Sequence, residues 1–255
     1  MLNFFNISIN KKLKEFNSSS ETTRIISFYQ WLGGLMDSDG SFSISKKKYL
    51  TCEITLSLRE INSLYKIKSK FGGSVTLRKK TKAVRWRLHK KKLLIEFLKA
   101  INGFIYLKKE KFTEVMKIYL PNEQIKLIEF KNSGAWLSGF FEGDGYVNLN
   151  SLSYQIVISI SQKKKDILEN IKQIYGGNIY FDKSWNGFKW EISEKKELVT
   201  IFEYFTLNPL RSSKNADIVS AKRFFRYKLL NYHLDEKKYL MLNHFIKLFQ
   251  KRKKI

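Results

Sequence analysis

The sequence contains the stretch WLGGLMDSDG at residues 31–40 and a second, similar stretch, WLSGFFEGDG, at residues 136–145. The two copies are 136 − 31 = 105 residues apart, so the chain divides into two halves of similar length, each with one copy near its start. Each copy is largely apolar until it ends in acidic residues and glycine. This pattern is typical of a helix, with Gly40 and Gly145 expected as the left-handed residues that end it.

Small residues recur at helical spacing within each copy. Gly34 and Ser38 are four residues apart, as are Gly139 and Gly143, so each helix has one small-residue face. Two such faces let helix backbones approach closely, as small residues at this spacing do in membranes. We expect the two helices to pack against each other with their equivalent ends together.

Acidic residues occupy the end of each predicted helix, where the helix dipole favours cations instead. Asp37 and Asp39 end the first copy, and Glu142 and Asp144 end the second. If the helices pair, up to four carboxylates converge, and a divalent cation such as Mg²⁺ would relieve their repulsion. The alternative is that these acids only cap loops; two copies on small-faced helices favour the metal site.

The paired stretch resembles the LAGLIDADG family of homing endonucleases. Residues 32–40 and 137–145 match its nonapeptide, with Gly33 and Ser138 at the alanine position and Glu142 at the first acidic position. The family fold accounts for roughly residues 27–232. The resemblance implies that Asp39 and Asp144 bind the catalytic metal, Mg²⁺, for which Mn²⁺ or Ca²⁺ can substitute in binding. Asp37 and Glu142 then have supporting roles, and we assign the neighbouring residues Ser38 and Gly143 to the metal site as well.

Composition points to a polyanionic partner. The chain has 255 residues, a net charge of +25 and 43% hydrophobic residues, so it combines a packed core with a strongly basic surface. Such charge predicts binding to nucleic acid through its phosphates. A basic ribosomal or membrane-surface protein is the alternative, but 15% aromatic residues and clear periodicity favour a packed fold. We expect no transmembrane helix and no disulfide framework, since Cys52 is the single cysteine.

The hydrophobic period predicts an α+β fold with the order α-β-β-α-β-β-α in each half. Antiparallel hairpins are expected at 41–58 and 74–89, and again at 146–161 and 178–193. We divide the chain into an N-terminal extension (1–23), a first half (24–120), a linker (121–133), a second half (134–232) and a C-terminal helix with a basic tail (233–255). The sequence allows this tail to be simply solvated.

Two sheets with one polar face each suit a saddle that faces DNA, because strands can enter the major groove. An ordinary solvent-exposed face is the alternative for any single residue, but the set as a whole, with the net charge, favours DNA contact. The predicted DNA-binding residues are Ser43, Ser45, Lys47, Thr55, Arg78, Lys80, Arg85, Arg87, Asn148, Asn150, Ser159, Lys183 and Lys189.

The family also uses basic and polar side chains around its metals. Its catalytic lysine is carried over to Lys111 and Lys214, with Lys108 and Lys109 as competitors in the first half. Glu53 and Gln155 are placed where the family has a polar strand residue near the metals. A histidine-based nuclease is disfavoured, because the three histidines show no paired spacing.

The resemblance implies a monomeric, metal-dependent endonuclease that cuts both strands of a long asymmetric DNA site and promotes intron mobility. Lysine far outnumbers arginine, which indicates an A+T-rich coding sequence and fits an intron of an organelle genome, in a mitochondrion or chloroplast. The main alternative is an RNA maturase that assists splicing of its own group I intron. A third is a DNA-binding regulator without nuclease activity.

Overall fold

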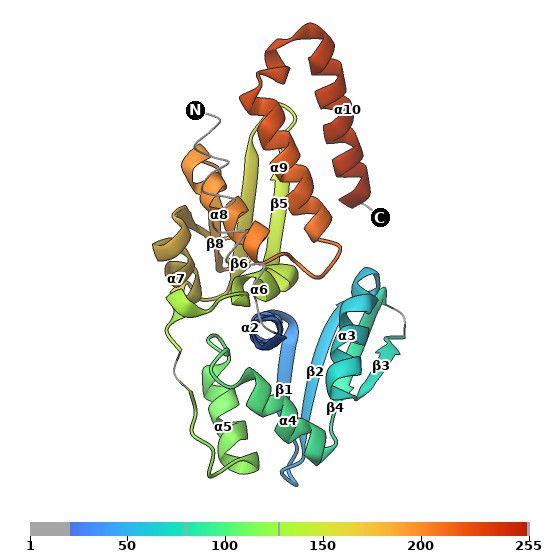
Figure 1. The fold of residues 1–255 in the computed structure, drawn as a ribbon, viewed down its shortest axis with the longest axis vertical. Helices are drawn as coiled ribbons and strands as arrows, with labels where there is room; N and C mark the ends of the chain where they lie inside the picture. The colour runs from blue at the N-terminus through green and yellow to red at the C-terminus, as the bar shows by residue number, and fades with distance from the viewer. Residues whose placement is uncertain (1–20, 80, 127, 254–255) are drawn as a thin grey trace.

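The computed structural model describes residues 21–79, 81–126 and 128–253, and it contains two similar halves stacked about a central pair of helices (Figure 1). Each half has a four-stranded antiparallel sheet backed by helices, which confirms the predicted α+β class. Most of the predicted N-terminal extension lies outside the described residues. Within the described ranges, no helix has the length and hydropathy of a bilayer-spanning segment.

The first half begins with the long helix that carries the first acidic motif. Its sheet has the order β1-β2-β4-β3. Its elements are α2 (Glu21–Asp39), β1 (Gly40–Ile44), β2 (Leu50–Ser57), α3 (Ile61–Phe71), β3 (Ser74–Leu77), β4 (Ala83–Leu88), α4 (Lys91–Ile101) and α5 (Lys109–Tyr119).

The second half repeats this order, and its sheet runs β5-β6-β8-β7. One further helix, α10, follows the repeat. The elements are α6 (Trp136–Asp144), β5 (Gly145–Leu149), β6 (Ile156–Gln162), α7 (Asp166–Tyr175), β7 (Asn178–Asp182), β8 (Gly187–Ile192), α8 (Lys195–Leu207), α9 (Asn215–Leu229) and α10 (Glu236–Lys253).

Each sheet covers its own hydrophobic core, and the two cores use equivalent residues. Trp86 of β4 and Trp190 of β8 are fully buried. Their indole N–H groups donate to the carbonyls of Gly72 and Gly176, at 2.9 and 2.8 Å. Both glycines have positive φ, 70° and 78°, and they end α3 and α7.

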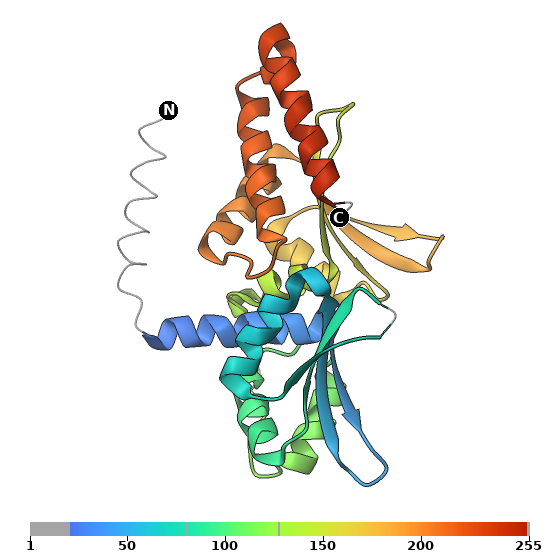
Figure 2. The ribbon, with the colours of Figure 1, turned by 90° about the vertical axis from the view of Figure 1, so that its right-hand side faces the viewer.

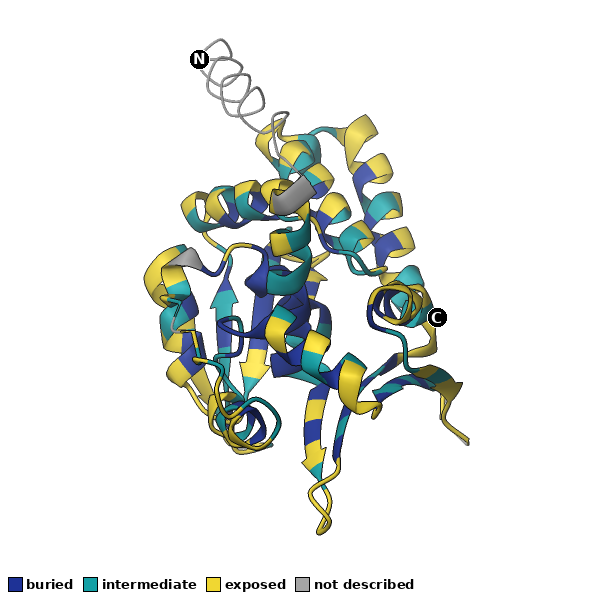
Figure 3. Ribbon diagram, turned by 60° about the horizontal axis from the view of Figure 1, so that its bottom comes forward, coloured by how far each residue is buried: buried dark blue, intermediate teal, exposed yellow. Residues whose placement is uncertain are grey.

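The opposite face of each sheet is open. Strands β2 and β5 alternate between buried and more exposed residues. Alternating colour bands of this kind are visible on strands in Figure 3. The strands of both sheets lie toward the same side of the molecule, and their hairpins extend from it (Figure 2). The fold therefore presents one continuous side made of two open sheet faces.

The expectation of left-handed glycines at the ends of the motif helices is wrong. Gly145 has φ −81° and ψ 150°, an extended backbone that leads directly into β5, and Gly40 likewise starts β1. Glycine is required there by space. A Cβ on Gly145 would lie 2.2 Å from the ring of Phe141, and one on Gly40 would lie 2.6 Å from Met36.

Candidate active site

The centre of the molecule is the contact between α2 and α6, where the backbones touch at glycine. A Cβ added to Gly34 would lie 1.9 Å from the carbonyl oxygen of Trp136, and one added to Gly139 would lie 1.8 Å from that of Trp31. No larger residue fits at either position without moving a backbone. The small-residue faces therefore pack against each other as predicted from their spacing.

This packing brings the two motif aspartates together. The Asp39 carboxylate lies against the end of α6, with Oδ2 2.8 Å from where a Cβ on Gly143 would be, and Asp144 is the next residue. Burial and then the charge of Asp144 raise the pKa of Asp39 to about 6, while Lys214 and Lys108 lower it. Two carboxylates from different halves thus share one electrostatic environment.

The two aspartates differ in their polar partners. Gln162, at the end of β6, donates from Nε2 to Asp144 Oδ2 at 2.6 Å. Burial raises the pKa of Asp144, and this hydrogen bond opposes it. Because Gly40 pairs with Ile54 and Gly145 pairs with Ile160, the residue equivalent to Gln162 in the first sheet is Leu56, which cannot donate. The two aspartates therefore differ in their side-chain hydrogen bonds, and the site is asymmetric.

A lysine closes the carboxyl-terminal end of each motif helix. Lys108 Nζ donates to the carbonyls of Met36, Ser38 and Gly40, at 2.9, 2.9 and 2.5 Å. In the second half Lys214 Nζ does the same to Phe141, Gly143 and Gly145, at 3.4, 2.9 and 2.8 Å. Each ammonium thus neutralises a helix end that already carries carboxylates. Burial lowers the pKa of both lysines, and the neighbouring aspartates oppose this.

Lys108, and not Lys111, is therefore the structural equivalent of Lys214, which corrects the predicted match. Lys111 points away and forms an ion pair with Glu114 at 2.7 Å on the surface of α5. Spacing narrows the choice without making it. Lys109 follows Asp39 by 70 residues, as Lys214 follows Asp144, but its side chain is exposed, whereas Lys108, at 69 residues, makes the equivalent hydrogen bonds.

The predicted metal residues Ser38 and Gly143 contribute backbone carbonyls that already accept from these lysines. The side chain of Ser38 points back along α2 and donates to the carbonyl of Leu35 at 3.2 Å. Their assignment to the metal site stays a prediction that rests on the carbonyl oxygens.

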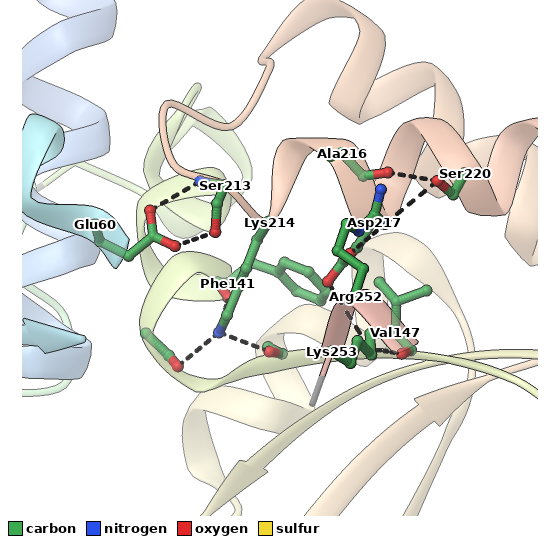
Figure 4. Close-up of polar contacts among 12 residues, drawn as sticks. Glu60, Phe141, Val147, Ser213, Lys214, Ala216, Asp217, Ser220, Arg252 and Lys253 are labelled. Atoms are coloured by element: carbon green, nitrogen blue, oxygen red, sulfur yellow. Dashed lines mark hydrogen bonds and ion pairs between the residues drawn. The ribbon is translucent and has the colours of Figure 1, made fainter. Parts of the chain in front are cut away.

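The loop before Lys214 is held by the other half of the protein. Glu60, at the start of α3, accepts from the backbone N–H of Ser213 at 2.8 Å, and its other carboxylate oxygen accepts from the Ser213 hydroxyl (Figure 4). This contact between the halves fixes the residue next to Lys214. No signal in the sequence links these distant positions.

The earlier acid of each motif is buried and structural. Asp37 accepts from the backbone N–H of Tyr106 and Lys108 at 2.7 and 2.9 Å, and from the Trp136 indole at 3.0 Å. In the second half, Glu142 accepts from the backbone N–H of Arg211 and Ser212. Both acids tie a motif helix to the loop that carries the lysine, which agrees with a supporting role.

Glu142 should make stability depend on pH. Burial raises its pKa from 4.5 to about 7. The folded state therefore holds this proton at pH values where the unfolded chain has lost it, and the resulting stability falls as pH rises from about 4.5 through 7. Across this range, the free energy of unfolding of the wild type should fall by about 3 kcal/mol relative to Glu142→Gln.

Urea unfolding in metal-free buffer between pH 4.5 and 8 measures this difference. Glu194→Gln, at an acid whose side chain is less buried at the start of α8, is the control and should follow the wild type. Parallel pH curves for the wild type and Glu142→Gln would contradict the assignment.

The two predicted strand residues lie elsewhere. Gln155 is exposed in the β5–β6 connection, seven residues before Gln162, which is roughly 20 Å along a strand. Its prediction as a site residue is wrong, and Gln162 takes its place. Glu53 accepts from Arg85 Nη1 at 3.2 Å and Arg87 Nε at 2.5 Å, so it orients two arginines on the open face; its catalytic role stays a prediction.

Most predicted DNA-binding residues lie on the open faces or in the hairpin loops. Ser159 is the exception, because its neighbours on that face leave it only 2% exposed, so the prediction that it contacts DNA is wrong. Lys80 lies outside the described residues. Lys189 forms an ion pair with Glu191 at 2.5 Å. The residues that remain accessible are Ser43, Ser45, Lys47, Thr55, Arg78, Arg85, Arg87, Asn148, Asn150, Lys183 and Lys189.

The carboxylate oxygens of this site are suitable ligands for a hard divalent cation. Within residues 21–79, 81–126 and 128–253, no group of three or more histidine, cysteine or acidic side chains is arranged to hold a metal. Asp39 and Asp144 offer two carboxylates, so water and other oxygen ligands would complete the shell. That combination suits Mg²⁺, which keeps several waters and uses one or two carboxylates with phosphates.

Comparisons with known proteins agree with this geometry. The model of the LAGLIDADG endonuclease family matches residues 32–119 and 137–225. The chain is 37% identical over 234 residues to the intron-encoded RNA maturase bI4 of Saccharomyces cerevisiae, covering 88% of this chain and 36% of that protein. It is 34% identical over 260 residues to the probable intron-encoded endonuclease aI2 of Debaryomyces hansenii, covering 94% and 39%.

The chain therefore spans less than half the length of these two relatives. Among solved structures, the LAGLIDADG homing endonuclease I-LtrWI bound to target DNA superposes with a TM-score of 0.67 at 18% identity, covering 87% of this chain and 97% of that one. This similarity shows that the fold is shared.

Proposed function

Since this chain belongs to the LAGLIDADG endonuclease family, we propose that it is a monomeric, metal-dependent endonuclease that cuts both strands of a long asymmetric DNA site and promotes intron mobility. One observation carries the proposal: Asp39 and Asp144, from different halves, interact at the ends of α2 and α6, from which β1 and β5 lead into the two open sheets. One aspartate per half suits one cut per strand. The intron-encoded relatives and the DNA-bound structural neighbour support the same function.

The side chains of this site would contribute charged groups to the reaction and hold them in place. Asp39 and Asp144 would hold Mg²⁺, which stabilises negative charge on a phosphate and helps to activate water for attack on phosphorus. Lys108 and Lys214 donate to the last carbonyls of the two motif helices and so fix the helix ends that carry the aspartates. Their positive charges balance those of the carboxylates. Gln162 orients Asp144, and the buried acids Asp37 and Glu142 hold the lysine-bearing loops.

The open faces would hold the duplex. Their lysines and arginines, with the net charge of +25, provide phosphate contacts, while serine, threonine and asparagine side chains can read base edges in the major groove. Glu53 fixes the guanidinium groups of Arg85 and Arg87 in the middle of the first sheet. The two sheet faces carry different side chains, which supports an asymmetric DNA target.

The function is tested on a duplex made of the two exons that flank the host intron, joined without it. With Mg²⁺, the protein should cut both strands near the exon junction, and EDTA should stop the reaction. Intron-containing DNA is the control and should stay intact, because the intron interrupts the site. Duplex binding without cutting would instead show a regulator.

A second candidate function is group I intron splicing as an RNA maturase, favoured by the similarity to the maturase bI4. Both functions place the gene inside an intron, and we propose an organelle genome as its location. Stimulation of splicing of its own intron RNA in vitro, without DNA cleavage, would favour the maturase.

The lysine assignment predicts a sharp contrast between two residues three positions apart. Lys108→Met should lower the cleavage rate by about 100-fold, because it removes the positive charge that ends α2 beside Asp39 and Asp144. Lys111→Met, which removes only a surface ion pair, is the matched control and should stay within about twofold. Single-turnover cleavage and thermal melting measure both. Equal loss in the two variants would contradict the assignment.

A further inference from the structure

The last turn of α10 lies against the second half of the protein, beside the site. This helix follows the repeat and has no counterpart in the first half. Lys253 has a side chain only 17% exposed; its Nζ donates to the carbonyl of Val147 in β5 and lies 3.7 Å from the centre of the Tyr146 ring (Figure 4). The expectation that the basic tail is simply solvated is wrong for this residue.

An acidic residue of α9 anchors the same turn. Arg252 Nη2 lies 2.6 Å from Asp217 Oδ1 and 3.3 Å from the Ser220 hydroxyl. Lys253 Nζ lies 3.8 Å from the other oxygen of Asp217. Asp217 follows Lys214 by one helical turn, so the end of α10 is fixed relative to the lysine that closes α6.

A cavity of about 280 Å³ opens between these elements, large enough for several water molecules. Its lining contains three cationic side chains and four acidic ones. Of the acids, Glu60 accepts from Ser213, Glu142 from Arg211 and Ser212, and Asp217 pairs with Arg252, while Asp39 is the carboxylate that we assign to the metal site. The residues that matter here are Asp39, Arg59, Lys214 and Lys253. Lys253 therefore shares one concave space with Asp39 and Lys214, although it comes from an element outside the repeat.

The ammonium of Lys253 retains capacity to bind a ligand. A lysine has three N–H donors, and among the described residues only the carbonyl of Val147 accepts a hydrogen bond from it. Asp217, at 3.8 Å, is beyond hydrogen-bond distance. The rings of Tyr146 and Phe249 lie 3.7 and 4.9 Å from Nζ, so no second oxygen accepts from this ammonium among the described residues. Phosphate oxygens that enter from the open face, where Tyr146 is 54% exposed, can take that place.

We propose that Lys253 binds a backbone phosphate at the strand-cleavage site that contains Asp39 and Lys214, so that this residue serves one DNA strand and not the other. The inference rests on the proposed endonuclease function. Because α10 has no counterpart in the first half, no equivalent of Lys253 reaches the site around Asp144 and Lys108 from such a helix, and Gln162 is the addition at that site.

The test is single-turnover cleavage of the joined-exon duplex with a different fluorophore on each strand. Lys253→Met keeps the apolar stem on Tyr146 and removes the charge. It should slow one strand by about 10- to 100-fold, the value for a lost charged hydrogen bond, so that nicked duplex accumulates. The slowed strand should be the one that Lys214→Met slows, and not the one that Lys108→Met slows.

Three further variants separate phosphate binding from helix anchoring. Lys253→Arg should restore most of the rate, and Lys253→Gln, which keeps a donor toward Val147, should behave like the Met variant. Lys251→Met, exposed two residues earlier, is the matched control and should leave both strands unchanged. Melting temperatures of all variants are measured alongside.

Two results would overturn the inference while the wild type still cuts. The first is an unchanged rate on both strands in Lys253→Met and Lys253→Gln. The second is an equal slowing of both strands that follows a lower melting temperature, which would make Lys253 an anchor only. Failure of the wild type to cut either strand would instead contradict the proposed function.

Discussion

Asp39→Asn and Asp144→Asn are each expected to abolish double-strand cleavage while DNA affinity changes by less than about threefold. Asparagine keeps the size of the side chain but removes the negative charge that holds a divalent cation, and loss of such electrostatic support lowers rates by at least about 100-fold. Affinity is set mainly by the many phosphate contacts of the two sheet faces, which neither change touches.

The two variants should also differ in detail. In Asp144→Asn the amide oxygen can still accept from Gln162, so its position is kept. Asp39 has no such partner among the described residues, and its replacement also removes the charge that opposes the low pKa of Lys214. Residual nicking is therefore expected to differ between the variants.

Strand-resolved cleavage in Mg²⁺ and binding by fluorescence anisotropy in Ca²⁺ measure these effects. Asp166→Asn, an exposed carboxylate in the first turn of α7, is the matched control and should cut normally. Full double-strand cutting by both single variants would show that these aspartates are not the metal-binding pair.

Among the glycine-to-alanine substitutions of this chain, Gly139→Ala should cause the largest loss of stability. The added Cβ would lie 1.8 Å from the carbonyl oxygen of Trp31 and 2.8 Å from the backbone nitrogen of Leu35. These are backbone atoms inside a packed helix pair, so they cannot turn aside as a side chain could. We expect a loss of about 3 kcal/mol or more, at the upper end for overpacked cores.

Urea unfolding of Gly139→Ala and the equivalent Gly34→Ala measures this loss. Ser161→Ala, on the exposed part of β6, is the control and should change the free energy of unfolding by less than about 0.5 kcal/mol. A loss below about 1 kcal/mol in both glycine variants would mean that the helices separate easily, contrary to the close contact.

The repeated motif predicted most of the fold because its chemistry is local. Small residues four apart predict the helix contact and alternating residues predict the strands, and both reappear in the structure. Gly40 and Gly145 were correctly placed at helix ends, but for the wrong reason. Glycine is needed at these positions because a Cβ would collide with Met36 or Phe141 where the chain turns from helix into strand.

The site was less predictable because its polar partners come from distant parts of the chain. The match of Lys111 to Lys214 followed local sequence similarity, whereas the hydrogen bonds to the end of α2, which come from a residue distant in the sequence, identify Lys108. Gln162 meets Asp144 through strand register, and one half has leucine at that position. The docking of α10 depends on the Arg252–Asp217 pair, which no repeat or period indicates.

The contact between α2 and α6 is reciprocal. Gly34 meets Trp136 and Phe140, and Gly139 meets Trp31 and Leu35, which are the same positions shifted by 105 residues. Reciprocity of this kind defines an isologous interface, the kind that joins identical subunits about a dyad. The single chain thus has the interface geometry of a homodimer, while Glu60, Leu56 and α10 mark where its two halves differ.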